Sequence, residues 1–281
     1  MSTHARAARN LCSAALVALA ALAHPVAAEP TSAVESASPA AKRVYFRAGI
    51  LHLAPLSSSD EMELSEVEGP ASLAIENGPV AGSGSEVSSA TIPAVIVGYR
   101  LTPRISLETI LGLPFSVKFR ATGTLATESL APMALGIPTG VEALGPELGE
   151  AKALPPVVTA VYDFLPGRRV RPYAGAGVAV LFAYDEKITN DALTEVSEPE
   201  FDIAPAPGLV LQTGVEATVW KRIYARLDVK FIAFMRANAE VRNIQMRTPE
   251  LPLFDYVDVG TARMSVWVNP LIVQAGIGTD F

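Results

Sequence analysis

The chain has 281 residues, half of them hydrophobic, and a formal net charge of −7. This acidic balance argues against nucleic-acid binding, because the phosphates of nucleic acids attract basic surfaces. One cysteine and three histidines rule out an internal disulfide framework and leave few ligands for a zinc site. We therefore expect no metal and no other cofactor.

Residues 1–28 have the layout of a cleaved secretory signal peptide. Arg6 and Arg9 precede an apolar run from Leu11 to Ala23, and the small residues 26–28 follow. The run is shorter than the ~20 residues of a spanning helix, so a membrane anchor is the weaker interpretation. Residues 29–42, rich in Ala, Ser and Pro, are predicted to be a disordered leader.

Eight later segments alternate apolar and polar residues with a period of two, as β-strands with two different faces do. In residues 222–236, apolar side chains fill the odd positions from 223 to 235, while Arg226, Asp228 and Lys230 occupy even positions. The predicted strands are Arg43–Pro55, Thr91–Leu101, Arg104–Phe119, Lys152–Phe164, Val170–Glu186, Pro207–Val219, Arg222–Arg236 and Val259–Phe281.

The connections between these segments indicate a membrane barrel. After residue 28 no apolar stretch of ~20 residues remains, and only helices and closed barrels satisfy their backbone hydrogen bonds in lipid. Short connections at 102–103, 165–169 and 220–221 alternate with long ones at about 56–90, 120–151, 187–206 and 237–258. We therefore predict an all-β fold: an eight-stranded antiparallel transmembrane β-barrel over residues 43–281, with short periplasmic turns and long extracellular loops, in the outer membrane.

Charged and aromatic residues follow the same division. The segment 56–90 is acidic and contains no basic residue, whereas the short turns carry arginine and lysine. Aromatic residues gather near the short turns and again toward the long loops, as in the girdles of such barrels. The last alternating strand ends on Phe281, through which we expect recognition by the outer-membrane assembly machinery. Outer-membrane lipid and lipopolysaccharide are further expected partners.

Several local motifs carry a family resemblance. They are Phe46-Arg47-Ala48-Gly49 running to Pro55, Leu113-Pro114-Phe115, Leu154-Pro155-Pro156, Tyr162-Asp163-Phe164 before Leu165-Pro166-Gly167, the run from Arg171 to Val178, and Asn269-Pro270-Leu271. With these motifs the chain resembles the outer membrane protein W (OmpW) family of eight-stranded barrels. The resemblance implies an outer-membrane protein that is associated with the passage of small hydrophobic molecules and performs no catalysis. The loops depart from it, being longer and more acidic than the family suggests.

Because side chains alternate between the two faces of a strand, the odd or even position of a residue (its parity) predicts whether it faces the barrel interior. Charged residues occupy the interior positions nearest the short turns: Arg47, Arg100, Glu108, Asp163, Arg171, Glu216, Arg226, Asp228, Lys230 and Asp280. Buried charges are costly unless paired, so this balanced set predicts a closed salt-bridge plug. Farther from the turns the interior positions are apolar: Leu51, Leu53, Ile92, Ile96, Ile110, Leu181, Val210, Ile232, Phe234, Val268 and Ile272.

Two hypotheses for function follow from this interior. In the first, an apolar pocket above the charged plug allows passive passage of a small hydrophobic solute, with sideways exit where prolines interrupt strand pairing, at Pro93, Pro114, Pro155, Pro156 or Pro270. In the second, the lumen is packed and inert, and the protein is a structural or surface-interaction barrel. An enzyme is not expected, because His52, the one histidine after residue 28, has outward parity.

Overall fold

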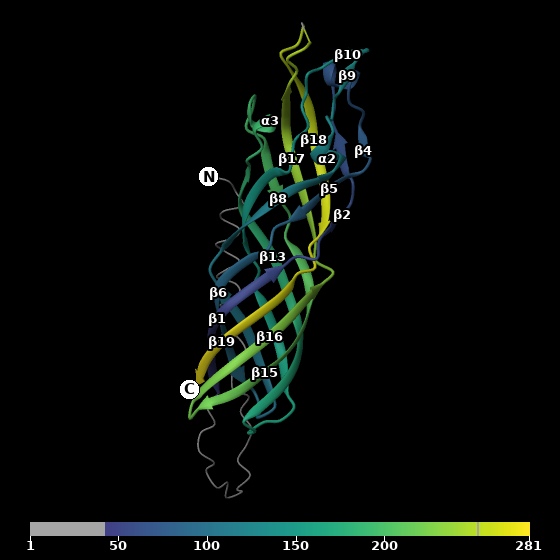
Figure 1. Cartoon of the computed structure of the whole chain (residues 1–281). Helices are drawn as coiled ribbons and strands as arrows, with labels where there is room; N and C mark the ends of the chain where they lie inside the picture. Colours follow the sequence, from purple (N-terminus) through teal and green to yellow (C-terminus); the bar gives the residue numbers. More distant parts are fainter. Residues whose placement is uncertain (1–42, 252) are drawn as a thin grey trace, which may run out of the picture. The chain divides into compact units, whose positions relative to one another are not determined.

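Eight strands close into an antiparallel barrel in the computed structural model, which describes residues 43–251 and 253–281. They are β1 (Val44–Ala54), β6 (Ala90–Arg100), β7 (Ile105–Gly112), β12 (Val157–Asp163), β13 (Val170–Ile188), β15 (Ala206–Trp220), β16 (Ile223–Ala233) and β19 (Leu271–Asp280). Each pairs with the next, and β19 pairs back with β1 (Figure 1). The predicted eight-stranded barrel is confirmed. The predicted signal peptide (1–28) and leader (29–42) lie outside the described residues.

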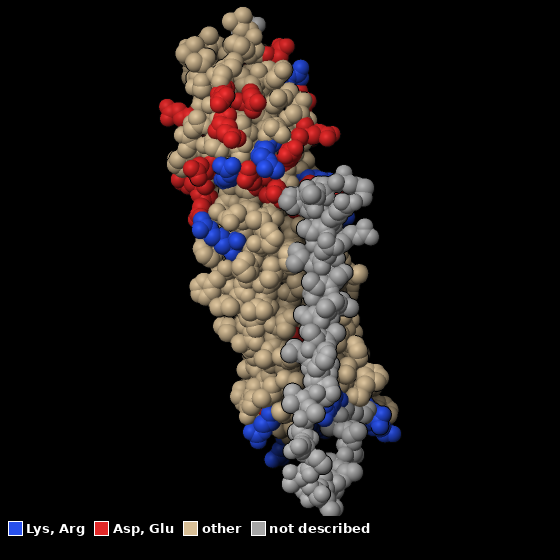
Figure 2. Space-filling model, turned by 180° about the vertical axis from the view of Figure 1, so that it is seen from behind, with Lys and Arg blue, Asp and Glu red and all other residues tan. Residues whose placement is uncertain are grey.

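The period-two pattern explains why this barrel suits a membrane. In β16, Arg226, Asp228 and Lys230 are buried inside, while Leu227 between them is 49% exposed. In β1, Arg47 is buried and Ile50 is 63% exposed. The outer surface is therefore apolar, the reverse of a water-soluble protein. Figure 2 shows a broad zone almost free of charged side chains on the visible face, between charged groups at either end.

Four predicted strands are interrupted at the end of the barrel that faces the extended loops, where the sequence pattern predicts that each continues. The segment 104–119 divides into β7 and β8 (Phe115–Gly123), and 152–164 divides between β11 (Glu147–Leu154) and β12. Likewise β16 is followed by β17 (Arg236–Arg247), and β18 (Tyr256–Trp267) by β19. Prolines 114, 155, 156 and 270 lie in three of these breaks and cannot donate to the ladder. In the fourth, Phe234 has a φ of 61°, which ends the extended conformation.

The predicted long loops fold into sheets of their own. One contains β5 (Ser83–Val87), β8, β11 and the upper part of β13, and is continuous with the barrel. The other contains β14 (Glu200–Ile203), β17, β18, β3 (Met62–Ser65) and β4 (Gly78–Val80), with β2 (Ser58–Ser59) beside β18. Short elements complete this part: η1 (Gly69–Leu73), α2 (Thr124–Thr127), β9 (Met133–Ala134), β10 (Ile137–Pro138) and α3 (Asp191–Thr194). We call residues 56–89, 113–156, 182–205 and 234–270 the extension.

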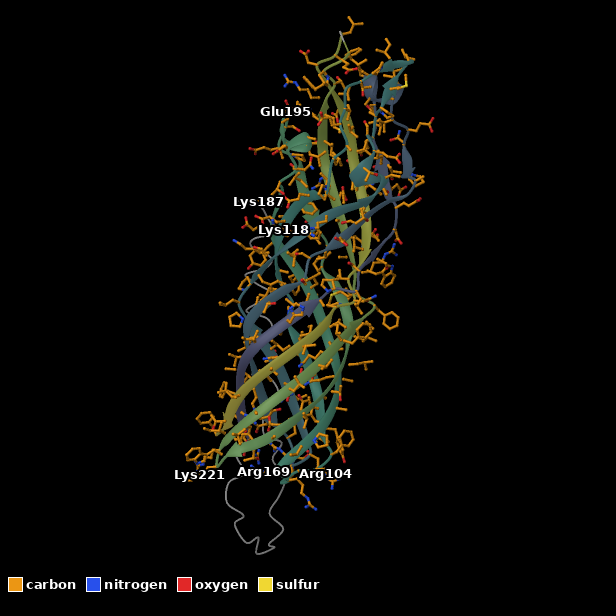
Figure 3. All side chains as sticks on the ribbon, in the orientation of Figure 1. Arg104, Lys118, Arg169, Lys187, Glu195 and Lys221 are labelled. Atoms are coloured by element: carbon orange, nitrogen blue, oxygen red, sulfur yellow. The ribbon has the colours of Figure 1, made fainter. Side chains whose placement is uncertain are left out.

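The extension has an apolar interior. Leu64, Leu125, Ile244 and Val259 belong to a buried cluster that lies entirely within it. A second buried cluster joins its lower part to the upper barrel. Figure 3 shows Lys118, Lys187 and Glu195 on the extension and Arg104, Arg169 and Lys221 at the opposite end, where the short turns lie. In barrels of this class the short turns face the periplasm. Across the described ranges, no helix has the length and apolar character needed to cross a membrane.

Candidate functional site

An ion-pair network crosses the lower half of the barrel interior, and its side chains line a small cavity of about 30 Å³. Arg47 Nε lies 2.6 Å from Glu216 Oε2, and Arg47 Nη2 lies 2.7 Å from Asp280 Oδ1. The other carboxylate oxygen of Asp280 lies 2.7 Å from Arg100 Nη1. Arg171 contacts Glu216 and lies 3.7 Å from Asp163. These contacts join residues from six strands into one cross-barrel layer.

A second layer follows immediately above. Both terminal nitrogens of Arg226 lie 2.7 Å from the Glu108 carboxylate, in a bidentate pair. Arg226 also lies 3.0 Å from Asp228, and Asp228 pairs with Lys230. All ten predicted interior charges therefore take part in ion pairs, five basic with five acidic. Because the set is neutral, burial leaves no charge uncompensated.

Two tyrosines that parity analysis did not single out complete the network. The Tyr45 hydroxyl lies 2.5 Å from Glu108 Oε1, and the Tyr173 hydroxyl donates to Asp228 Oδ1 at 2.6 Å. Each ring lies over a glycine: a Cβ at Gly98 would overlap the Tyr45 ring, and one at Gly214 would overlap Tyr173. Gln212 donates to Glu108 and Asp228 at 2.9 and 2.7 Å. A tyrosine opposite a strand glycine is the signal that could have revealed these positions.

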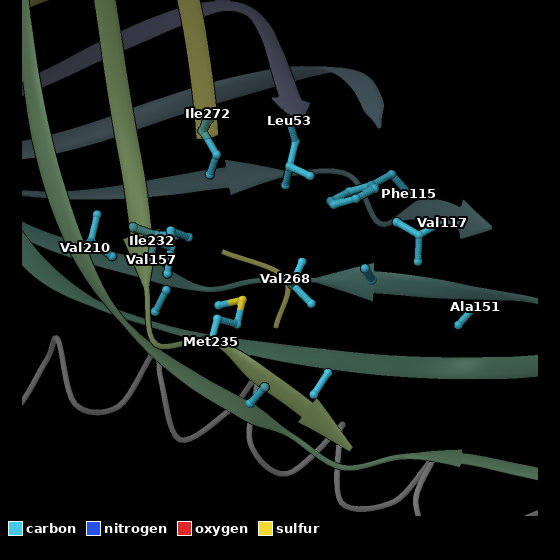
Figure 4. Packing of buried hydrophobic residues seen from close by; sticks show 14 of the residues in the cluster. Leu53, Phe115, Val117, Ala151, Val157, Val210, Ile232, Met235, Val268 and Ile272 are labelled. Atoms are coloured by element: carbon cyan, nitrogen blue, oxygen red, sulfur yellow. The ribbon is translucent and has the colours of Figure 1, made fainter. Parts of the chain in front are cut away.

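The predicted pocket residues lie above the ion pairs, with one exception. Leu53, Leu181, Ile232 and Val268 line a cavity. Leu51, Val210 and Ile272 are buried in the adjoining cluster, and Ile110 packs against it. Ile96 is buried beside Ile110 in the register of β6 and β7. Figure 4 shows Ile232, Val210, Ile272 and Leu53 close together with Met235 and Phe115.

Phe234 does not line the cavity, contrary to the prediction. Its side chain is 69% exposed, whereas Met235 is 1% exposed and lines the cavity. The positive φ of Phe234 breaks the extended backbone, so the parity of residue 232 does not continue past residue 233. A one-residue change in parity moves every later side chain to the other face of a strand.

The cavity has a volume of about 130 Å³ and reaches from the top of the barrel into the extension. Among its lining residues only Ser85 and Arg263 have polar side chains. Most of the extension residues that line it, such as Leu64, Leu144 and Leu193, belong to segments predicted as loops. They were missed because the elements that contain them are short or irregular and their packing partners are distant in sequence.

Strand pairing in the barrel wall is interrupted beside this cavity. β7 pairs with β12 only as far as Thr109 and Val158, while β8 and β11 resume pairing at Phe115 and Ala153. In the described structure no register pair joins residues 110–114 to residues 154–157. Pro114, Pro155 and Pro156 lie in this interval, which we call the wall gap. Leu111 and Leu113 within it are 56% and 66% exposed.

Among the residues that the structure describes, the remaining polar groups do not form a cluster with metal-ligand or catalytic-triad composition. His52 points out of the barrel and hydrogen-bonds to Thr91 at 2.8 Å. No cluster of three potential metal ligands occurs among residues 43–251 and 253–281. In the extension, a hydrogen bond from Arg263 at 3.2 Å holds the pKa of Glu240 below its usual value, although partial desolvation opposes this. This pair joins register partners of β17 and β18.

Comparison with known proteins identifies the family. The sequence profile of the OmpW family matches residues 44–281. The chain belongs to the OmpW family. Its barrel is therefore an outer-membrane barrel of this family, as the local motifs suggested.

Individual relatives of this OmpW-family protein are distant in sequence. An uncharacterised outer-membrane protein of Sinorhizobium fredii, y4mB, is 28% identical over 153 residues, which cover 54% of this chain and 56% of that protein. The chain thus matches little more than half the length of that relative. The crystal structure of OprG from Pseudomonas aeruginosa superposes with a TM-score of 0.65 at 18% identity, covering 86% of this chain and 96% of OprG. At that identity the likeness supports the fold alone.

Proposed function

We propose that this barrel lets small hydrophobic molecules pass passively from the cell exterior into the outer membrane. The observation that carries the proposal is the 130 Å³ cavity, whose lining is apolar apart from Ser85 and Arg263. An apolar solute entering it would leave water, which is favourable by about 25 cal/mol for each Å² of apolar surface removed. The ion pairs below would prevent it from crossing the lumen to the periplasm.

The lining and volume of the cavity define the class of solute. A charged group entering it would find few partners, because Arg263 is already engaged by Glu240 at 3.2 Å. An engineered apolar cavity of roughly 150 Å³ in another protein binds benzene. The proposed solute is therefore uncharged and about the size of one aromatic ring.

The wall gap offers a route out of the cavity. Phe115 and Ala153 line the cavity and flank the residues 110–114 and 154–157, where strand pairing is interrupted. Pro155 lines the cavity from within this interval. A solute leaving there would enter the hydrocarbon beside the exposed Leu111 and Leu113. This sideways route requires no opening of the ion-pair network, which makes it the less costly path.

Substitution of two neighbouring residues tests the proposal. Ile232→Lys places a charge in the cavity lining, whereas Phe234→Lys places one on an exposed position two residues away. Cells producing each variant would be supplied with toluene, and its entry would be followed by gas chromatography. Entry should fall severalfold for Ile232→Lys and stay at the unaltered level for Phe234→Lys. Heat-modifiable gel migration serves as the folding control.

The second candidate is a structural or surface-interaction barrel without transport. The separate buried cluster within the extension favours it, because a folded extracellular part presents a stable surface to partners. If Ile232→Lys folds and leaves toluene entry unchanged, passage through the cavity is refuted and this candidate is supported. For either candidate we propose no catalytic role, since the exposed outward-facing His52 lacks an acidic partner in the described structure.

A further inference from the structure

The short turns carry a concentration of positive charge that the proposed passage does not use. They connect β6 to β7, β12 to β13 and β15 to β16. Together with the residue before β1 they present six exposed basic side chains, which we call the periplasmic rim: Arg43, Arg104, Arg168, Arg169, Lys221 and Arg222. Figure 3 shows three of them at this end, and Figure 2 shows basic groups along it on the visible face.

The charge of the rim is not neutralised by the described part of the chain. Residues 101–104, 164–169 and 220–222 contain no Asp or Glu. The acidic residues nearest in sequence to these turns, Glu108, Asp163 and Glu216, pair with internal arginines of the ion-pair network. Within residues 43–251 and 253–281, no ion pair within 4.0 Å involves a rim residue. The rim therefore presents unpaired cations to its surroundings.

The aromatic residues beside the rim set its depth in the membrane. Arg43 donates to the Tyr99 hydroxyl at 3.3 Å, and Arg104 donates to the Tyr162 hydroxyl at 3.0 Å. Trp220 is 67% exposed in the same region. Because exposed tyrosine and tryptophan prefer the level of the lipid headgroups, the rim cations lie where lipid phosphates lie. Guanidinium groups bind phosphate with two parallel hydrogen bonds.

We propose that the periplasmic rim binds the phosphates of anionic phospholipids in the inner leaflet of the outer membrane. The distribution of charge favours this leaflet over the outer one. The extension contains 22 acidic and 8 basic residues, so its net negative charge repels anionic groups. The rim, by contrast, places cations on every short turn, and each basic residue near an anionic surface adds to the attraction.

Energy transfer from Trp220 provides a local test. The protein has two tryptophans, so in a Trp267→Phe background Trp220, at the rim, is the sole donor. The protein would be placed in phosphatidylcholine vesicles containing a trace of phosphatidylglycerol or phosphatidylcholine, each labelled with dansyl on an acyl chain. The rim variant is Arg168→Gln, Arg169→Gln, Lys221→Gln and Arg222→Gln. The matched control removes four exposed cations of the extension, through Lys118→Gln, Lys187→Gln, Arg242→Gln and Arg247→Gln.

Phosphatidylglycerol should be enriched over phosphatidylcholine near Trp220, and 0.5 M NaCl should weaken the enrichment. The rim variant should lower it by at least about tenfold, while the control variant should leave it unchanged. If the rim variant does not fold, the pairs at 168–169 and 221–222 are changed separately, and the salt dependence of the unaltered protein still decides. The proposal is overturned if phosphatidylglycerol is not enriched near Trp220, or if the enrichment persists in the rim variant. So does rim-dependent sedimentation with purified peptidoglycan in the absence of phosphatidylglycerol enrichment.

Discussion

Replacement of Arg226 by methionine should destabilise the barrel strongly, and a second substitution should reverse part of the loss. Arg226 holds Glu108 through two 2.7 Å contacts and lies 3.0 Å from Asp228. Without it, the buried network contains five acidic and four basic groups. Removing one partner of a buried pair costs about 3–5 kcal/mol, because a charge is left uncompensated in a poorly hydrated interior. We expect the free energy of unfolding to fall by that amount.

The double variant Arg226→Met with Glu108→Gln separates charge balance from packing. It restores neutrality, and buried pairs replaced on both sides are often close to neutral in stability. We therefore expect it to regain at least about 2 kcal/mol relative to Arg226→Met alone, an interaction energy in the range seen for contacting residues. Urea titrations in vesicles, followed by tryptophan fluorescence and gel migration, give these values.

The control for this cycle is Arg247→Met in the extension. Arg247 lies 2.6 Å from Glu195, but both side chains are about half exposed, so the loss should stay below about 1 kcal/mol. If the double variant is no more stable than Arg226→Met alone, charge balance does not explain the network. The contacts of Arg226 would then stabilise the barrel by packing, for example on the Tyr173 ring 4.3 Å away.

Three further changes test other parts of the structure. Pro155→Thr with Pro156→Thr should narrow the wall gap by restoring backbone donors and should slow toluene entry, whereas Pro93→Thr, within the paired β6 strand, should not. Gly98→Ala should displace the Tyr45 ring and lower stability by about 1–3 kcal/mol in a urea titration, while Gly145→Ala, with nothing near its Cβ, should cost less despite its positive φ. Arg263→Gln should raise the pKa of Glu240 in a carbon-13 NMR titration. Because that pKa is lowered in the folded protein, the pair stabilises at neutral pH, and its contribution is lost as acidification protonates Glu240.

Local periodicity contains enough information for the barrel but not for the extension. A strand such as β16 crosses the membrane once with an unbroken alternation of apolar and polar residues. The inward direction of the side chains at 226, 228 and 230 can therefore be predicted without knowing which strands pair with β16. The alternation ends at Phe234, where a single residue adopts the left-handed conformation, so parity assigns this side chain to the wrong face. Such a conformation at phenylalanine has no sequence signal, since it is uncommon outside glycine and asparagine.

The extension was hidden for a different reason. Its strands are short: β3 has four residues and β4 three. β3 pairs with β18, nearly 200 residues later, as in the register of Thr261 with Ser65. The sequence around Met62 and Leu64 looks like that of an acidic surface loop. Their burial depends on residues far away in the sequence, which local patterns do not identify. The cavity was consequently expected in the barrel alone, while much of its lining comes from the extension.

The nineteen-residue strand β13 constrains how this protein can be shortened. Its upper residues pair with β11, as Ala183 does with Ala153, so they depend on a neighbour that belongs to the extension. A trimmed barrel lacking residues 115–154 but retaining all of β13 would carry a protruding ribbon with unsatisfied amides and carbonyls. Such a bare edge recruits other chains, and the product would self-associate through it. A minimal version of this protein should therefore end β13 near Leu181, its last partner residue with β15.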